Sequence, residues 1–411
     1  MERQVFSFLL VVALLLPPSN IALGQDWAFK DVAVSDGIYA ITENNTLVKL
    51  TKSLEPLWAL ELQRNAYIER LIPSNDGVLL LGGLLAKLDG NGTLLWAKNL
   101  SVEDAEPLPN GDIALLTDNV VGRISRNGRI LWATKILPNG TNERTPRVEV
   151  RFVAPLREAI LVVGTISLPD DPKSHLFLGT LSLNGSLLWA KVINTSYHDS
   201  PDTAHSMGNY ALVAGVYGGG SDAPWIADYF ALKVSPDGKI EWFNSYMCPK
   251  GENWDAFWTM RIQGAFCNGE VCAFDTTTGT FIINSEGEPL EYPNVSGKVA
   301  GIMNDSLVLL SKGTILTVPL RQNGETEKCY ALKIHFRDEP VDVRAVPAEF
   351  KAPDLHLSVV KLGERSEPKK EDEKLDNPQE TEPKGKNYYG IALTALALVG
   401  IALMVFRKTK R

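Results

Sequence analysis

The chain has 411 residues, 45% of them hydrophobic, with 41 basic and 49 acidic residues and a net charge of −8. This length and apolar content allow one large or two ordinary domains with a buried core. The acidic excess is a poor electrostatic match for nucleic acid, so we expect no nucleic-acid partner.

Residues 1–24 have the features of a secretion signal. Arg3 gives a basic start, and residues 6–16 form an apolar run that is too short to span a bilayer comfortably. Ala22 and Gly24 are the small residues expected before a cleavage site at the 24/25 junction. The alternative, an uncleaved anchor, is opposed by the proline pair that follows the apolar run.

One unit is repeated along the chain: a strand, a turn that usually contains Asn-Gly or Asp-Gly, and a second strand ending in Trp. The fullest copy is 228–242, DYFALKVSPDGKIEW, in which residues alternate with the two-residue period of a strand. Further copies span 47–62, 86–100, 122–136 and 179–193. The repeat tryptophans, expected to pack between neighbouring sheets, are Trp27, Trp58, Trp96, Trp132, Trp189 and Trp242.

A bare apolar strand precedes each hairpin. These strands are at 37–41, 78–81, 112–116, 159–165 and 210–216, with a degenerate sixth unit at 267–292 and a seventh at 307–336. Such a unit, repeated at about 40 residues, is typical of a β-propeller blade. We therefore expect an all-β fold, a β-propeller over 25–340 with seven blades, six or eight being the alternatives. We also expect Asp26–Ala33 to pair in the same blade as Lys328–Phe336 and so close the ring.

The carboxyl-terminal part predicts a membrane anchor. Residues 341–363 have strand-like ends and either pack on the ring or begin a stalk, and residues 364–387 are a charged, proline-dotted stretch that we expect to be a disordered stalk. Residues 388–406 are apolar and long enough for one transmembrane helix, and the basic tail 407–411 places the C-terminus in the cytoplasm. The ectodomain would then be extracellular.

Four cysteines, Cys248, Cys267, Cys272 and Cys329, fall in the last third of the ectodomain. In an exported protein an even number predicts two disulfides, and four cysteines allow three pairings. Cys267 and Cys272 flank Asn-Gly and are placed to bridge a hairpin, which would leave Cys248 with Cys329. A zinc site is the alternative, although the spacing fits no ordinary zinc module.

The N-x-S/T sequence occurs repeatedly and predicts an outward-facing, glycosylated surface. The candidate sites are Asn44, Asn91, Asn99, Asn139, Asn184, Asn194, Asn294 and Asn304. Asn91 and Asn184 lie in hairpin turns, where Asn-Gly also serves the backbone.

Two loop regions are candidate binding sites. Trp225, Trp254, Asp255 and Trp258 form an aromatic group that would stack on a sugar or clamp a peptide; blade packing is the alternative. Asp222 and Asp228 could hold Ca²⁺ with loop carbonyls, or belong to a solvated loop. We expect no other cofactor, because the sequence has no H-E-x-x-H, P-loop, G-x-S-x-G or dinucleotide-binding fingerprint.

At residues 202–242 the sequence resembles a known class of repeats. The D-x-A-x-S element at 202–206, the strand 210–215 and the hairpin 228–242 are similar to the SBBP-type and PQQ-like propeller repeats of bacterial and archaeal surface proteins. The resemblance implies a propeller but no activity. Quinone dehydrogenases use similar repeats, yet this chain lacks C-x-x-C-H and an adjacent cysteine pair. With its signal, stalk and lone anchor, the chain resembles membrane-tethered propeller proteins of archaea.

These features predict a single-pass cell-surface protein that binds or scaffolds an extracellular protein or glycan. The alternatives are an exported propeller enzyme, either glycan-cleaving or dependent on a quinone or metal, and an accessory subunit of a membrane complex. Acids clustered around a central channel would favour the enzyme, and an exposed aromatic patch without such acids would favour binding.

Overall fold

The computed structural model describes residues 27–63, 66–140, 145–219, 223–247, 260–277, 279–290, 292–293, 297–303, 305–320, 326–327 and 329–362. No helix within these ranges has the length and apolar character needed to cross a membrane. The predicted signal, stalk and transmembrane segment lie outside the described residues.

Seven antiparallel sheets succeed one another along the chain. Blades 1 and 2 contain β1 (Phe29–Val34), β2 (Ile38–Thr42), β3 (Thr46–Leu50), β4 (Pro56–Leu62), β5 (Ile68–Ser74), β6 (Gly77–Gly82), β7 (Leu85–Asp89) and β8 (Leu94–Lys98). Blades 3 and 4 contain β9 (Asp104–Pro107), β10 (Ile113–Thr117), β11 (Val120–Ile124), β12 (Ile130–Pro138), β13 (Arg147–Pro155), β14 (Ala159–Ser167), β15 (Ser174–Ser182) and β16 (Leu187–Asn194). Blades 5, 6 and 7 contain β17 (His198–Met207), β18 (Tyr210–Gly219), β19 (Ala223–Val234), β20 (Ile240–Met247), β21 (Ile262–Cys267), β22 (Val271–Thr276), β23 (Gly279–Asn284), β24 (Pro289–Leu290), β26 (Lys298–Met303), β27 (Ser306–Ser311) and β28 (Thr314–Pro319).

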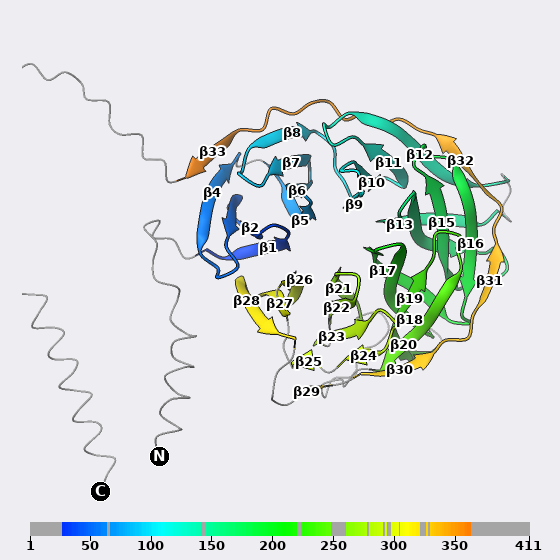
Figure 1. The fold of residues 1–411 in the computed structure, drawn as a ribbon. Coiled ribbons are helices and arrows are strands. Elements are labelled where there is room, and N and C mark those ends of the chain that lie inside the picture. The colour runs from blue at the N-terminus through cyan, green and yellow to red at the C-terminus, as the bar shows by residue number, and fades with distance from the viewer. Residues whose placement is uncertain are drawn as a thin grey trace, which may run out of the picture. The chain divides into compact units, whose positions relative to one another are not determined.

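The sheets stand around a ring with their first strands innermost (Figure 1). Each first strand contacts the first strand of the next blade, and β26 of blade 7 contacts β1 of blade 1. The all-β, seven-blade prediction is therefore confirmed. The predicted closure is wrong: β1 pairs with β2 of its own blade, and the 328–336 region pairs with blade 5.

A β-bulge before each of the five hairpin tryptophans, Trp58, Trp96, Trp132, Trp189 and Trp242, explains how neighbouring blades join. In β4, for example, Trp58 pairs with Lys49 and Pro56 with Leu50, so Leu57 is the extra residue and turns outward. Trp58 then reaches the next blade and donates a hydrogen bond from Nε1 to the carbonyl oxygen of Gly90, at 3.1 Å. Equivalent bonds run from Trp96, Trp132, Trp189 and Trp242 to the hairpin turn of the following blade.

The glycine of each hairpin turn is required by that packing. Gly185 has φ +86°, and a Cβ placed on it would lie 2.9 Å from the ring of Trp132. Both the left-handed backbone and the close approach therefore favour glycine. The Asn-Gly and Asp-Gly signals of the sequence thus serve the turn and the face on which the preceding blade's tryptophan packs.

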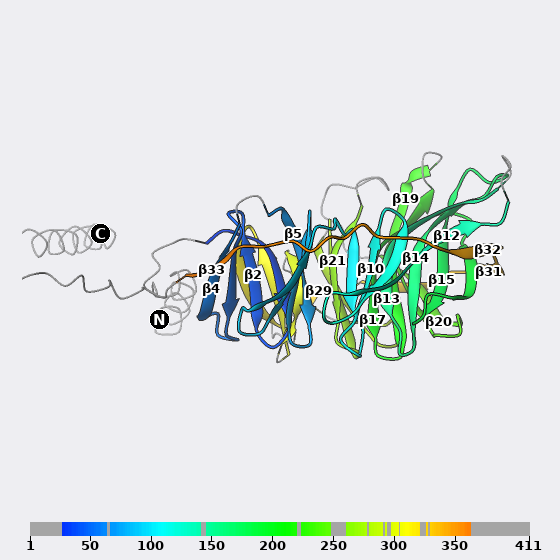
Figure 2. The same cartoon turned by 90° about the horizontal axis from the view of Figure 1, so that it is seen from above.

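The last part of the structure, residues 329–362, forms a belt around the outside of the ring. It contains β30 (Tyr330–Lys333), β31 (Arg337–Pro340), β32 (Val343–Pro347) and β33 (Val359–Leu362), and it follows a small sheet of β25 (Tyr292–Pro293) and β29 (Thr326–Glu327). The belt strands pair with the outer strands of blades 5, 4, 3 and 1 in that order, and a bridge between Lys98 and Asp354 marks blade 2. Figure 2 shows the belt crossing the outer side of the blades. Of the two alternatives for 341–362, packing on the ring is correct.

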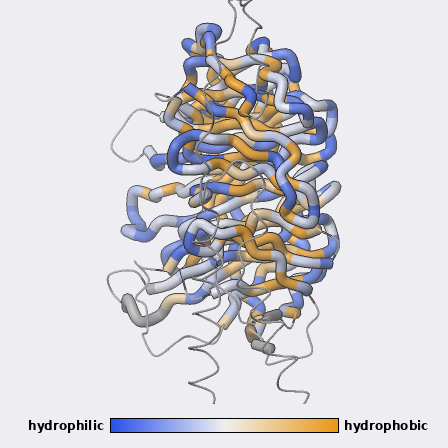
Figure 3. The backbone as a smooth tube through the Cα atoms, turned by 90° about the vertical axis from the view of Figure 1, so that its left-hand side faces the viewer, coloured by the Kyte–Doolittle hydropathy of each residue, from blue (hydrophilic) through white to orange (hydrophobic). Residues whose placement is uncertain are grey.

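The hydrophobic core lies between blades. Along the tube, apolar residues follow the strands and polar residues concentrate at the connections (Figure 3). The buried side chains form six clusters, and each joins neighbouring sheets; Tyr39 of blade 1, for example, shares a cluster with Leu80 of blade 2. Because a single blade leaves its apolar faces open, the ring is the unit that buries them.

Candidate functional site

The two faces of the ring differ. In an antiparallel four-stranded blade, the first strand starts on the face where the second and third strands connect. We call this the mouth face, and the opposite face, which holds the Asn-Gly and Asp-Gly hairpin turns, the turn face.

A second bulge lies near the start of most inner strands, and Arg151 in β13 and Asp202 in β17 are its extra residues. Gly164 and Gly215 on the adjacent strands leave the room that these bulges need, because a Cβ there would collide with the carbonyl oxygens of Glu149 and Ser200.

The inner strands line a central cavity of about 300 Å³, to which all seven contribute. Glu106 of blade 3 and His205 of blade 5 meet in this cavity. Oε1 of Glu106 lies 3.2 Å from Nδ1 of His205. The other ring nitrogen of His205 lies 2.9 Å from the hydroxyl of Thr203. The contact between Glu106 and His205 bridges blades 3 and 5, which are not neighbours in the ring.

Two buried aspartates that line the cavity link neighbouring blades. Asp31 of blade 1 accepts hydrogen bonds from the Leu71 N–H of blade 2 and from the Lys298 ammonium of blade 7, both at 2.5 Å. Asp104 of blade 3 accepts from Arg70 of blade 2 and from the Val153 N–H of blade 4, both at 3.0 Å. Acids therefore do cluster at the channel, but these two are engaged in holding blades together.

Asp202 is positioned differently. It accepts a hydrogen bond from the Ile262 N–H of blade 6 at 2.9 Å, while its other oxygen lies 4.0 Å from Arg261, whose side chain is 45% exposed. Burial raises the pKa of Asp202 to about 6, against the opposing effects of the Ile262 N–H, Arg261 and Arg151. A proton on this carboxyl is therefore exchangeable just below neutral pH.

Beside Asp202, the mouth face is hollowed over blades 3 to 6. The hollow measures about 560 Å³ and carries both guanidinium and carboxyl groups. Its polar and charged residues are Glu103, Asp118, Asn119, Glu149, Arg151, Asp202 and Arg261. Arg151 donates to Glu149 at 3.0 Å and Asn119 accepts from the Val150 N–H at 2.8 Å, so part of the wall is preorganised. The hollow offers hydrogen-bond donors and acceptors together, and Phe152 also lines it.

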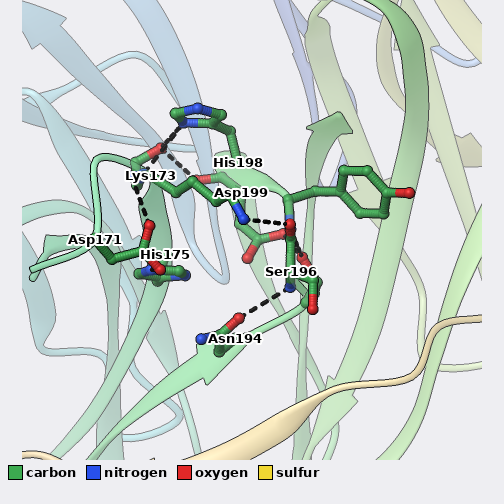
Figure 4. A network of polar contacts seen from close by, with 10 residues as sticks. Asp171, Lys173, His175, Asn194, Ser196, His198 and Asp199 are labelled. Atoms are coloured by element: carbon green, nitrogen blue, oxygen red, sulfur yellow. Dashed lines mark hydrogen bonds and ion pairs between the residues drawn. The ribbon is translucent and has the colours of Figure 1, made fainter. Parts of the chain in front are cut away.

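A separate buried polar cluster lies between blades 4 and 5 (Figure 4). His175 is fully buried with Nε2 3.1 Å from Asp171, and its Nδ1 has no hydrogen-bond partner among the described residues. Asp199 is also fully buried: Oδ1 accepts from the Thr195 hydroxyl at 2.8 Å, and within the described part of the chain Oδ2 has no side-chain hydrogen-bond partner. Burial raises the pKa of Asp199 to about 8, although hydrogen bonds from Thr195 and from the Leu176 N–H oppose the rise. This carboxyl is therefore protonated in the folded protein at neutral pH.

We predict that Asp199→Asn changes how stability depends on pH. The folded carboxyl keeps its proton up to about pH 8, whereas the unfolded one loses it near pH 4, so wild-type stability falls between these values. Between pH 5 and pH 8 the free energy of unfolding of the variant, relative to that of the wild type, should rise by on the order of 3 kcal/mol, as measured by urea unfolding.

Asp36→Asn is the control for this experiment. Burial raises the pKa of Asp36, but hydrogen bonds from Lys49 and Tyr39 outweigh it and hold the pKa below its ordinary value. The stability that Asp36 contributes is lost only below that ordinary pKa. The difference in free energy of unfolding between Asp36→Asn and wild type should therefore be constant between pH 5 and pH 8. A flat offset for Asp199→Asn as well would contradict the protonation assigned here.

The predicted aromatic site falls mostly outside the described residues. Trp254, Asp255 and Trp258 lie in the undescribed 248–259 stretch, and Trp225 is placed only as part of the backbone of β19. The flanking elements, the end of β20 and the start of β21, lie on the mouth face. Of the calcium candidates, Asp222 is not described, and the Tyr217 hydroxyl donates to Asp228 at 3.5 Å. Among the described residues no group of three potential ligands is close enough to hold a metal.

The hairpin disulfide between Cys267 and Cys272 is confirmed. Cys329, the first residue of the belt, is also disulfide-bonded, and Cys248 lies outside the described residues.

Of the sequon residues, Asn44, Asn91, Asn99, Asn139 and Asn184 are exposed, Asn194 is half-buried, and Asn294 and Asn304 are not described. Asn139 donates from Nδ2 to Asp342 of the belt at 2.6 Å.

Sequence reasoning gave no role to the residues that line the hollow. Arg151 and Arg261 have no motif around them, and their position depends on bulges and connections. Asp202 opens the D-x-A-x-S element, which was the one signal that could have identified it.

No family model and no curated protein matches this sequence. Among solved structures, the chain is similar to the Neurospora crassa Pan2 WD40 domain, with 11% identity, a TM-score of 0.45, and coverage of 69% of this chain and 86% of that one. It is also similar to PorZ, a surface component of the type-IX secretion system of Porphyromonas gingivalis, with 11% identity, a TM-score of 0.42, and coverage of 74% and 38%. A Bacteroides caccae protein of unknown function gives 15% identity, a TM-score of 0.32, and coverage of 54% and 82%.

Proposed function

We propose that this chain is a cell-surface protein whose propeller binds an extracellular protein or glycan through the hollow on its mouth face. The observation that carries the proposal is the pair of arginines, Arg151 and Arg261, on either side of the buried Asp202. Arginine presents several donors in a fixed plane and is enriched where interfaces concentrate their binding energy.

The chemistry of the hollow sets the kind of partner. The guanidinium groups suit carboxylate or hydroxyl oxygens, and the carboxylate oxygens of Asp118 and Glu149 suit hydroxyl or amide donors. A peptide segment with acidic side chains or an acidic glycan would satisfy both. The secretion signal and the apolar 388–406 stretch support a tethered, outward-facing location.

The binding test uses the full chain as bait and Arg151→Ala/Arg261→Ala as the variant. The variant should lose at least about tenfold in affinity for a partner or glycan retained by the wild type, because two donors in a buried contact are removed. The control is Arg126→Ala/Arg129→Ala, which removes the same charge from exposed positions on the turn face. Equal losses in both variants would indicate a general charge effect and contradict a site at the hollow.

An exported hydrolase is the second candidate, and Asp202 is the residue that favours it. A carboxyl whose pKa lies near 6 is suited to general acid catalysis, and glycan cleavage uses such a group with a second carboxylate. Turnover of a glycan panel that is abolished by Asp202→Asn, with binding retained, would favour the enzyme over the binding protein.

A further inference from the structure

The belt contacts all six apolar clusters, and it meets the blades in the reverse of their order along the chain. At least one apolar belt side chain packs on each cluster, so the belt joins neighbouring blades from outside the ring. Successive contacts are Ala331 at blades 5 and 6, Phe336 at blades 4 and 5, Val343 at blades 3 and 4, Phe350 at blades 2 and 3, Leu357 at blades 1 and 2, and Leu362 at blades 7 and 1.

The attachment of the belt is uneven along its length. Its first residue, Cys329, is fixed by a disulfide, and β30, β31 and β32 then pair with blades 5, 4 and 3 in quick succession. Between β32 and β33 the belt is held at blade 2 by the bridge between Lys98 and Asp354, with backbone hydrogen bonds that join Asn99 to Pro353 and Leu355 to Ala97. Because Cys329 is covalently held, release of the belt from β33 breaks no covalent bond, whereas release from the Cys329 end does.

The β33 end lies at the junction of blades 7 and 1. Among the described residues, the polar contacts across this junction include the Phe29 N–H donating to the carbonyl oxygen of Gly313 at 2.9 Å and the ion pair of Lys298 with Asp31. Leu362 packs on the apolar cluster that these two blades form. Detachment of β33 would remove this support.

We propose that the belt is a latch that opens from β33 and thereby loosens the seam between blades 7 and 1, while its Cys329 end stays attached. The device is built into the fold and does not depend on the proposed binding site. A pull or a competing strand applied at the carboxyl-terminal side of Leu362 would open it residue by residue, because β33 is held by four residue pairs.

Hydrogen exchange on the full chain tests the latch. In the wild type, amides of β33 should exchange at least about tenfold faster than those of β30, because β33 can open locally whereas β30 directly follows the disulfide-bonded Cys329. A disulfide made by Glu61→Cys/Val360→Cys, which are paired between β4 and β33, should slow exchange in β33 and also at Phe29 across the seam.

The matched control locks the anchored end. Met247 and Tyr330 are paired between β20 and β30, and both are exposed, so Met247→Cys/Tyr330→Cys introduces a comparable bond. This lock should leave exchange at Phe29 unchanged. Equal wild-type protection of β33 and β30, no effect of the β33 lock on Phe29, or the same effect from both locks would each overturn the proposal.

Discussion

Replacing Trp58 with alanine is expected to lower the free energy of unfolding by about 3 kcal/mol, a value at the lower end for large aromatic-to-alanine changes because the ring is only half-buried. The change removes the hydrogen bond to the Gly90 carbonyl and the packing of the indole on Gly92 of the next blade. It also removes the edge contact with Tyr39, whose ring centre lies 6.0 Å away. Chemical denaturation measures the effect.

Leu57→Ala is the matched control for this prediction. Leu57 is the adjacent bulge residue, and 57% of it is exposed, so its truncation should cost less than about 0.5 kcal/mol. Blade 5 carries Glu241 at the same bulge position, which shows that the outward site tolerates a charge. Similar losses for the two variants would contradict the role assigned to the bulge, which is to turn the tryptophan toward the next blade.

Asp31→Ala is expected to destabilise the ring by about 3 kcal/mol, since it leaves the Leu71 N–H and the Lys298 ammonium without their acceptor. Asp31 is 1% exposed and contacts blades on both sides of its own, so its loss affects two interfaces at once. Lys298 is partly exposed and can turn toward water, which keeps the expected cost below that of a fully buried pair. Thermal unfolding at fixed pH provides the measurement.

Asp36→Ala provides the comparison on the same blade. Asp36 pairs with Lys49 at 2.6 Å, but its side chain is 44% exposed, so the loss should remain below about 1 kcal/mol. If Asp31→Ala and Asp36→Ala lower the stability by the same amount, the buried position of Asp31 between three blades is not a principal source of ring stability.

The hairpins of the ring could be predicted because local chemistry determines them. An apolar alternation, an Asn-Gly or Asp-Gly turn and a terminal Trp suffice to indicate each unit from 47–62 to 228–242. The apolar cores between blades then follow from the requirement that every sheet bury two faces. The seven-blade count needed the structure only where blades 6 and 7 lose the tryptophan signal.

The order in which the belt crosses the blades could not be predicted, for a physical reason. The belt strands are short and pair only through the outer edge of a blade, so they lack the alternating burial that marks a strand in a sequence. Residues 337–340, RDEP, are all exposed and still form β31. Their position depends on the free edge of β16, which belongs to a distant part of the chain.

The hollow was missed because bulges decide which side chains reach it. A bulge shifts one residue out of the alternation, and nothing in the residue types around Arg151 signals this shift. The closure prediction failed for a related reason. The DWAFK segment resembles the end of a hairpin, yet Phe29–Val34 has its own partner in β2 and needs no other.

Paired cysteines test the order in which the belt crosses the blades. Lys135 is opposite Val346 in blade 3, whereas Glu339 is opposite Val192 in blade 4. Lys135→Cys with Val346→Cys should form a disulfide in the full chain, detected by peptide mass mapping without reductant. Lys135→Cys with Glu339→Cys should not. Bond formation by the second pair in place of the first would contradict a belt that runs backward around the ring.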